Sequence, residues 1–305
     1  MKKQIGVIAD IHSNYTAFKT AVDYMVNRGI TEFFLLGDFV SDTTDTVETM
    51  QFIYELMGKY SVKVLRGNRE EYIINQRNVL RGKSDAPKWI YNSASGNLLY
   101  TLDLLTDKDI DFFESLPITF KYECDGYPSI TCCHGSPENS RELMQLEGDN
   151  TKVWLDKIDT DYLIAAHTHY QGGMDYKGKR YFNTGSTGIA IDAPGVAQCL
   201  VLHGSDVSEP DGPSWTAEFL NLPYDVDYVI NSCYEKGLME KGQWFISNYI
   251  YVLKTGIDIT PQLISTAITL QQDATGNPVN WPYIDEEYFT EAAKILGIPD
   301  YRRIS

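Results

Sequence analysis

Seven oxygen and nitrogen donors follow the main apolar runs of this 305-residue sequence, each where a run ends. Taken singly, such residues have ordinary explanations, because a Gly-Asp pair often forms a turn and an Asn often caps a helix. Here they occur at five run ends, and four of the five histidines of the chain are among them. They are Asp10 and His12 after IGVIA, Asp38 after FFLLG, Asn68 after KVLRG, His134 after SITCC, and His167 and His169 after YLIAA.

These donors together are typical of a transition-metal site. Two carboxylates, four imidazoles and one amide oxygen, without a thiolate, favour Mn²⁺, Fe²⁺, Zn²⁺ or Ni²⁺ over Ca²⁺ and Mg²⁺, which prefer oxygen ligands alone. Asp10 and His12 are two residues apart, as are His167 and His169, so each pair can point to one side of an extended segment. Seven donors suffice for two ions if one carboxylate bridges them. The sequence therefore predicts a dinuclear metal centre.

The elements that must position these donors indicate an α/β fold. Apolar strands are predicted at 4–9, 33–36 and 62–65, and helices with apolar residues on one face at 15–28 and 46–59. This order indicates a parallel sheet covered by helices. The carboxyl ends of parallel strands meet at one edge of the sheet, where ligands bind. We therefore expect the polar residues at the run ends to lie together.

The rest of the chain divides into three parts. Residues 69–115 are predicted to be mostly helical, either as an insertion with a solvated face or as a lid that carries phosphate-binding charge over the metals. Strand patterns between 118 and 222 indicate a mixed sheet packed on the first. Residues 223–305 are predicted to form successive helices. The prediction is a domain of residues 1–222 followed by a helical C-terminal appendage.

Composition narrows the classes of partner. The net charge is −16 and no basic stripe occurs, which argues against duplex nucleic acid as a ligand. An anionic substrate would need a local positive centre such as metal ions. No apolar stretch approaches the roughly 20 residues that span a bilayer, so we expect a cytoplasmic protein without a membrane partner. The five cysteines form no C-x-x-C and are expected to be reduced and mostly buried.

The motifs D-x-H, G-D, G-N, H-G and H-x-H, in this order, resemble those of the calcineurin-like metallophosphoesterase superfamily. Within that superfamily the sequence is most similar in kind to a bacterial phosphodiesterase-like member. The resemblance covers about residues 4–222 and includes N-T-G-S at 183–186. It implies a fold of two mixed β-sheets packed as a sandwich and flanked by helices. It also implies that Asp38 bridges two ions. The other ligands would be Asp10, His12 and His169 for one ion, and Asn68, His134 and His167 for the second.

The resemblance implies a dinuclear phosphoesterase that hydrolyses a small phosphodiester or phosphomonoester by attack of a metal-bridging hydroxide, with diesters slightly favoured. A dinucleoside polyphosphate and a protein phosphoserine are alternative substrates. The alternative function is a catalytically silent metal-binding scaffold for protein interaction, since a retromer subunit that resembles this family has lost metal ligands. Here all seven positions hold competent donors, which favours the enzyme. The oligomeric state is left open.

Arg69 departs from the pattern of the family, which often has histidine after the G-N pair. Histidine at this position can give a proton to the leaving group, whereas arginine stays charged at neutral pH and cannot. We therefore expect Arg69 to act catalytically by donating hydrogen bonds to a phosphoryl oxygen. The alternative prediction is an ion pair of Arg69 with Glu70 or Glu71 at the start of a helix.

Overall fold

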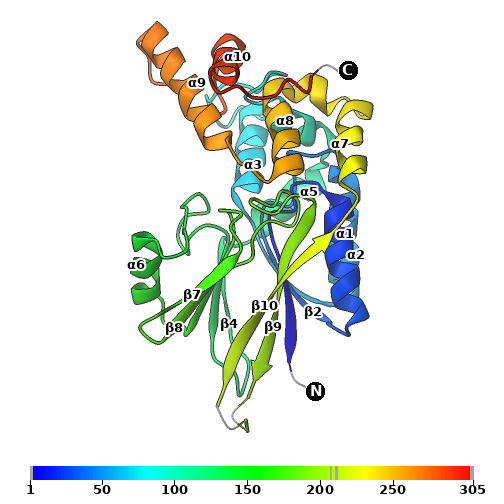
Figure 1. Ribbon diagram of the computed structural model, residues 1–305, viewed down its shortest axis with the longest axis vertical. Coiled ribbons are helices and arrows are strands. Elements are labelled where there is room, and N and C mark those ends of the chain that lie inside the picture. Colours follow the sequence, from blue (N-terminus) through cyan, green and yellow to red (C-terminus); the bar gives the residue numbers. More distant parts are fainter. Residues whose placement is uncertain (1–2, 207, 210–211, 303–305) are drawn as a thin grey trace.

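Two five-stranded sheets form the centre of the molecule in the computed structural model, which describes residues 3–206, 208–209 and 212–302 (Figure 1). The first sheet consists of β1 (Gln4–Ile8), β2 (Glu32–Leu36), β3 (Ser61–Leu65), β9 (Val196–Ser205) and β10 (Ser214–Pro223), in the order β10-β9-β1-β2-β3. The second consists of β4 (Thr119–Tyr122), β5 (Ile130–Cys133), β6 (Tyr162–Ala165), β7 (Gly172–Tyr176) and β8 (Lys179–Asn183), in the order β4-β5-β6-β8-β7.

Helices cover the outer faces of both sheets. Because side chains alternate along a strand, Phe34 of β2 faces the second sheet, whereas Phe33 packs toward the helices on the outer face. The predicted α/β fold with two mixed sheets flanked by helices is confirmed. The helices are α1 (Tyr15–Asn27), α2 (Thr46–Lys59), α3 (Asn68–Leu80), α4 (Gly96–Leu104), α5 (Asp107–Ser115), α6 (Asp149–Lys157), α7 (Val226–Glu235), α8 (Leu238–Thr255), α9 (Thr260–Thr275) and α10 (Glu286–Ile295).

The strand pattern of residues 118–222 predicted one separate sheet, and this prediction is wrong. β9 and β10 return to the first sheet, where β9 pairs antiparallel with β1. β1 pairs parallel with β2 on one side only, so its other edge needs a partner, and β9 supplies the hydrogen bonds. The first sheet is therefore mixed, and its parallel strands β1–β2–β3 carry Asp10, His12, Asp38 and Asn68 at their carboxyl ends. The three remaining donors follow β5 and β6 of the second sheet.

The C-terminal helices pack against the helical segment that follows β3. Their apolar cluster contains Phe245, Ile250 and Phe289, and it also takes in Ala94 and Tyr100 from the earlier segment. In Figure 1 these helices lie together at one end of the molecule, beyond the carboxyl ends of the first sheet. The division of the chain at residue 222 remains a prediction.

The composition-based predictions can be compared with the same structure. Among the residues that the structure describes, no helix combines the length and the apolar character that crossing a membrane requires. All five cysteines are free thiols, and four of them are buried. This agrees with the expectation of reduced, mostly buried cysteines.

Gly96→Ala should destabilise the junction between α4 and α8. A Cβ at Gly96 would lie 1.8 Å from the carbonyl oxygen of Lys241, so the two helices would have to move apart. We expect the free energy of unfolding to fall by about 1–3 kcal/mol, as for other overpacked contacts. The measurement is urea denaturation followed by circular dichroism.

Gly58→Ala is the matched control for this substitution. Gly58 is an exposed residue of α2 with no atom within 4 Å of its added Cβ, so the change should stabilise the helix by about 0.5–1 kcal/mol. If Gly96→Ala were as stable as the parent protein, the tight packing of α8 on α4 would be wrong.

Candidate metal centre

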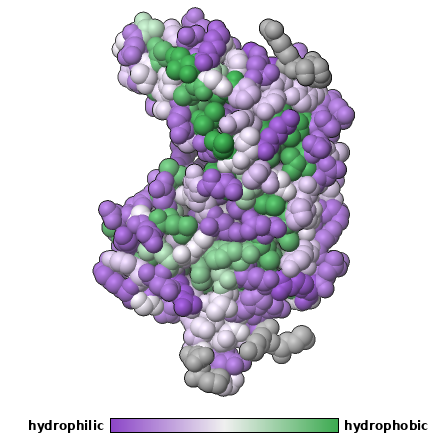
Figure 2. All heavy atoms as spheres, in the orientation of Figure 1, coloured by the Kyte–Doolittle hydropathy of each residue, from purple (hydrophilic) through white to green (hydrophobic). Residues whose placement is uncertain are grey.

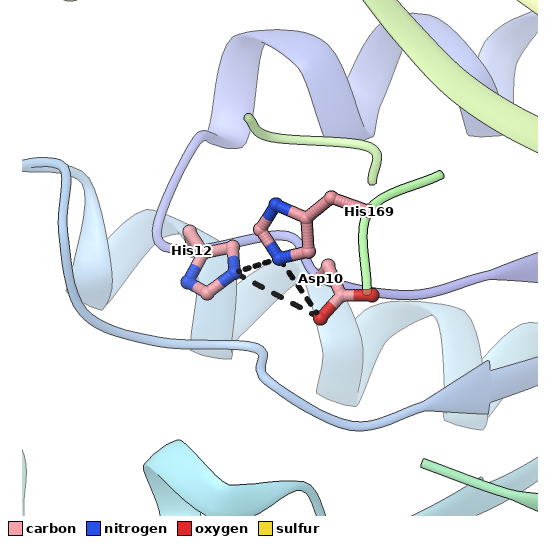
Figure 3. Close-up of side chains that lie close together, drawn as sticks. All are labelled: Asp10, His12 and His169. Carbon is pink, nitrogen blue, oxygen red and sulfur yellow. Dashed lines mark hydrogen bonds and ion pairs between the residues drawn. The ribbon is translucent and has the colours of Figure 1, made fainter. Parts of the chain in front are cut away.

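The structure brings all seven predicted donors together at the carboxyl ends of the strands. Ligand atoms of Asp10, His12 and His169 lie within 4.8 Å of one another (Figure 3), which we call the first cluster. Ligand atoms of Asp38, His134 and His167 satisfy the same limit and form the second cluster. Asn68, the first residue of α3, places its Oδ1 3.0 Å from Nε2 of His134.

Lone pairs converge in the first cluster. His169 Nδ1 lies 2.9 Å from the carbonyl oxygen of Ile189, which only accepts hydrogen bonds, so Nδ1 carries the proton of the neutral ring. His169 Nε2 then presents a lone pair 3.4 Å from Asp10 Oδ1 and 3.1 Å from His12 Nε2. His12 Nδ1 lies 2.9 Å from a carboxylate oxygen of Asp42, which favours the same tautomer in His12.

These atoms fit a bound cation. Asp10 Oδ1 is fully buried and has no hydrogen-bond partner among the described residues, and such an orphaned oxygen is costly. Two imidazole lone pairs that face each other repel unless a positive charge lies between them. A mixed set of nitrogen and oxygen donors is the set that transition metals prefer. The first cluster can therefore hold one divalent ion.

The second cluster has the same character and lies beside the first. His134 Nδ1 is 2.8 Å from the carbonyl oxygen of Leu36, so its Nε2 faces the cluster. His134 Nε2 lies 3.4 Å from Asp38 Oδ1 and 3.8 Å from Asp10 Oδ1. Because the imidazole of His134 contacts a carboxylate from each cluster, the two clusters form one continuous site.

The electrostatics of the site favour positive charge. Burial opposes ionisation of Asp38, but His134 and His12 outweigh it and hold the pKa of this carboxyl well below its usual range. Burial lowers the pKa of His134, but the carboxylates of Asp38 and Asp10 raise it to about 10. Burial and the neighbouring His134 lower the pKa of His167 to about 4. The carboxylates thus attract either protons or metal ions, and metal binding here releases protons.

Backbone strain is concentrated at the same residues. Five of the seven donors have positive φ angles. Residues other than glycine adopt such backbone conformations at a cost of about 1–3 kcal/mol each. Gly37 and Gly67 let the chain segments approach closely, since a Cβ at Gly67 would lie 2.2 Å from Asp38 Oδ1. The strained donors are Asp10 (51°), His12 (52°), Asp38 (51°), His167 (66°) and His169 (61°).

Glu70 fixes the loop that carries Asp38, and the sequence reasoning missed it. Its carboxylate accepts hydrogen bonds from the backbone N–H groups of Asp38 (2.9 Å), Phe39 (2.8 Å) and Gly67 (2.8 Å). Glu70 is the third residue of α3, the position of the acidic residue in a capping box. That spacing was the signal that could have identified it.

The N-T-G-S segment supports the ligands through their backbone. Asn183 Nδ2 donates to the carbonyl oxygen of Ala166, just before His167. Ser186 Oγ donates to the carbonyl oxygen of Asp10 at 2.9 Å. These hydrogen bonds tie the ends of β1 and β6 to each other.

Arg69 lies at the site and is held by residues far away in the sequence. Its Nη2 is 3.0 Å from Asp42 Oδ2 and donates to the Tyr249 hydroxyl at 2.9 Å. Its guanidinium lies 5.4 Å from the ring centre of Trp281. Its Nε is buried and has no hydrogen-bond partner in the described part of the chain. Nε lies 3.9 Å from Asp38 Oδ2, so the guanidinium borders the metal centre.

The alternative prediction was an ion pair of Arg69 with Glu70 or Glu71. Among the described residues, Arg69 forms an ion pair with neither of them. Glu70 is engaged by backbone N–H groups, and Glu71 accepts a hydrogen bond from Ser140 Oγ. The acidic partners of Arg69 are Asp42, at 3.0 Å, and Asp38, at 3.9 Å. Asp42 is buried, but Arg69 and His12 stabilise its charge and lower its pKa. Asp42 lies in the segment SDTTD, which carries no pattern that distinguishes it.

The donors open into a cavity of about 340 Å³, lined by His12, Asp38, Asn68, His167 and His169 on one side. The opposite wall comes from α8, from the start of α9 and from the loop before α6. Figure 2 shows the molecule hollowed between α9 and the α6 side of the second sheet. Of the predicted insertion 69–115, Arg69 alone among the described residues lines this cavity. The residues of the opposite wall include Leu143, Tyr249, Val252, Asp258, Thr260 and Ile264.

Known proteins share both sequence and fold with this chain. The sequence profile described as calcineurin-like phosphoesterase matches residues 3–230. An uncharacterized protein of Methanocaldococcus jannaschii is 22% identical over 253 residues, which cover 77% of this chain and 92% of that protein. The crystal structure of a hypothetical protein from Pyrococcus horikoshii has a TM-score of 0.65 and 20% identity, covering 84% of this chain and 99% of that one. A metallophosphoesterase from Sphaerobacter thermophilus has a TM-score of 0.61 and 19% identity, covering 84% and 100%.

Proposed function

We propose that this protein, which belongs to the calcineurin-like phosphoesterase family and is a hydrolase of phosphoric ester bonds, acts on a small phosphodiester. Hydrolysis would take place at a centre of two divalent ions. The observation that carries the proposal is the close approach of ligand atoms of His12, His169 and Asp10 to one another, beside an adjacent cluster of the same chemistry.

Each donor has a proposed role in this centre. Asp38 would be the ligand shared by the two ions, a role supported by its position beside His134 and by the contact of His134 with the carboxylates of both Asp38 and Asp10. The mixed nitrogen and oxygen set supports Mn²⁺, Fe²⁺, Zn²⁺ or Ni²⁺. The remaining ligands are Asp10, His12 and His169 for one ion, and Asn68, His134 and His167 for the other.

Two divalent ions, when bound, supply an acidified water as nucleophile and neutralise charge on the phosphoryl oxygens. The protein contributes orientation and further positive charge. The carbonyl oxygens of Leu36 and Ile189 fix the tautomers and ring directions of His134 and His169. The guanidinium of Arg69, which lines the cavity, donates to a non-bridging phosphoryl oxygen and stabilises the charge that develops there.

The cavity supports a diester rather than a monoester. A diester carries one negative charge and two organic groups, whereas a monoester dianion requires more positive charge. Among the described residues that line the cavity, Arg69 is the one guanidinium or ammonium group, and Asp258 adds a carboxylate. The apolar side chains of Leu143, Val252 and Ile264 offer surface for the organic groups.

Metal analysis combined with paired substrates tests this function. The protein as purified should contain transition metal. With Mn²⁺, Ni²⁺ or Zn²⁺ it should hydrolyse bis(p-nitrophenyl) phosphate with a higher kcat/KM than p-nitrophenyl phosphate, and Mg²⁺ should support less activity. Absence of bound metal together with absence of hydrolysis under every ion would contradict the proposal. A higher kcat/KM for the monoester would refute the diester preference but would agree with the proposed metal centre.

A further inference from the structure

Asp42 is a buried carboxylate that contacts a predicted metal ligand without being one itself. Its Oδ2 lies 2.9 Å from Nδ1 of His12 and 3.0 Å from Nη2 of Arg69. The same oxygen accepts a 3.2 Å hydrogen bond from the hydroxyl of Tyr249, and Oδ1 accepts one from the side-chain amide of Asn97. Four partners thus surround one carboxylate, whose residue has an exposed fraction of 1%.

These four partners come from parts of the chain that are far apart. His12 follows β1, and Arg69 lies in the first turn of α3. Asn97 belongs to α4 and Tyr249 to α8, which lies wholly beyond residue 230, where the match to the family profile ends. Asp42 therefore connects α4 and α8 to the segment that carries a predicted ligand.

The loop that carries Asp42 also holds the backbone of His12. The carbonyl oxygen of His12 accepts hydrogen bonds from the backbone N–H (3.2 Å) and the hydroxyl (2.7 Å) of Thr43. The backbone N–H of Ser41 donates to Ser13 Oγ at 3.0 Å. Ser41 and Asp42 have φ angles of 85° and 71°, conformations that cost residues other than glycine about 1–3 kcal/mol each. The contacts with the His12 segment offset this strain and keep Asp42 beside the imidazole.

The contact with Asp42 decides which nitrogen of His12 faces the first cluster. A carboxylate only accepts hydrogen bonds, so Nδ1 of the neutral ring carries the proton and Nε2 keeps its lone pair. This Nε2 lies 3.1 Å from Nε2 of His169 and 3.8 Å from Asp10 Oδ1. A carboxylate behind a ligating imidazole also makes it more basic, and loss of such a partner typically lowers metal affinity by about 10–100-fold.

Neutralisation of Arg69 is the simpler role for Asp42. A buried guanidinium requires an anionic partner, and Asp42 provides one at 3.0 Å. This role alone does not account for the position of the same oxygen 2.9 Å from Nδ1 of His12. The two roles also differ in their consequences, because neutralisation affects stability, whereas a hold on His12 affects the affinity for a metal ion.

We propose that Asp42 is a positioning residue of the metal centre, which acts through His12. Its carboxylate holds the proton of Nδ1, so the imidazole keeps Nε2 directed to the first cluster. The same oxygen holds Arg69 at the edge of the centre, so a metal ligand and the arginine proposed to bind the phosphoryl oxygen share one anchor. This inference rests on the proposed function, because the ion that His12 would bind belongs to the proposed centre.

Calorimetric titration of the metal-free full chain with Mn²⁺ tests this role. The parent protein should bind two ions. Asp42→Asn should weaken one of them by about tenfold or more and leave the other nearly unchanged. His12→Ala should weaken the same ion, and a variant with both substitutions should bind no more weakly than His12→Ala alone, because Asp42 acts through His12.

Two further variants separate this effect from a loss of stability. Asp45→Asn removes a buried carboxylate of the same loop, which pairs with Lys236 and contacts none of the predicted ligands in the described part of the chain. It should leave both ions at the parent affinity. Arg69→Gln serves if Asp42→Asn alone does not fold, because the uncompensated charge is then absent. Arg69→Gln should bind both ions at least as tightly as the parent, and adding Asp42→Asn should weaken one.

The nuclear magnetic resonance spectrum of the histidines reports the contact itself. In the Zn²⁺-loaded protein, the nitrogen-15 spectrum should show a proton on Nδ1 of His12, shifted downfield by the carboxylate. The chain has five histidines, and this signal is identified by its absence in His12→Ala. Asp42→Asn should move the signal upfield, whereas Asp45→Asn should leave it in place.

Three outcomes would overturn the proposal. These are parent affinity of a folded Asp42→Asn variant for both ions, an equal loss of affinity in Asp45→Asn, and an unchanged His12 Nδ1 signal in Asp42→Asn. Each is compatible with a parent protein that binds two ions and hydrolyses the diester, which is measured on the same samples. A parent protein that binds no Mn²⁺ and hydrolyses no ester would instead contradict the proposed function, and this inference with it.

Discussion

Asp38→Asn should lower kcat/KM for phosphodiester hydrolysis by about a thousandfold or more and reduce the metal content of the protein. The carboxylate of Asp38 is 2% exposed and lies 3.4 Å from His134 Nε2, and we assign it as the anion shared by both ions. An amide supplies an oxygen but no charge, so both ions lose their common anionic ligand. The fold should persist, because the amide oxygen can still accept the 2.8 Å hydrogen bond from the backbone N–H of Arg69.

The measurement is metal content per chain together with kcat/KM for bis(p-nitrophenyl) phosphate. His12→Ala serves as the graded comparison, because it removes a ligand of the first cluster alone and should leave the second partly filled. Asp156→Asn, an exposed carboxylate on α6 that pairs with Lys177, is the control and should change neither quantity. An Asp38→Asn protein with full activity and two metals per chain would refute the bridging assignment.

Arg69→Ala should lower transition-state stabilisation by about 2–4 kcal/mol, the range for other preorganised donors. Both metals should remain, because Arg69 is not among the proposed ligands. Arginine cannot give a proton to the leaving group, so the parent enzyme should cleave aryl esters far faster than alkyl esters. Arg69→His should flatten this dependence on the leaving-group pKa by restoring a proton donor. The measurement is kcat/KM across a series of diesters with leaving groups of graded pKa.

Tyr249→Phe separates the chemical role of Arg69 from its packing. This change removes the hydrogen bond that the hydroxyl accepts from the guanidinium and the 3.2 Å one that it donates to Asp42, but it keeps the ion pair between Arg69 and Asp42. The expected loss is therefore smaller, about 0.5–1.5 kcal/mol. Metal content and thermal stability are measured beside the kinetics. If Arg69→Ala cleaved aryl diesters at the parent rate, Arg69 would serve only to neutralise the buried Asp42.

The sequence determined the donors and the edge at which they gather. Apolar runs of strand length fix where strands end, and the rule that parallel strands share one carboxyl edge places Asp10, Asp38 and Asn68 together. Both facts depend on short stretches of chain, so they could be predicted without coordinates. The inability of Arg69 to donate a proton to the leaving group could also be predicted from the sequence, because it is a property of the guanidinium itself.

The tertiary structure decided the surroundings of these donors. Arg69 is held by Asp42, which lies 27 positions before it in the sequence. Tyr249, 180 positions after Arg69, contacts both Arg69 and Asp42. No local sequence pattern marks either residue. The positive φ angles at the donors, the return of β9 to the first sheet and the wall supplied by α8 and α9 depend likewise on contacts between distant segments. Periodicity and spacing report which face of an element is apolar, but the partner that covers that face is set by the packing of the whole chain.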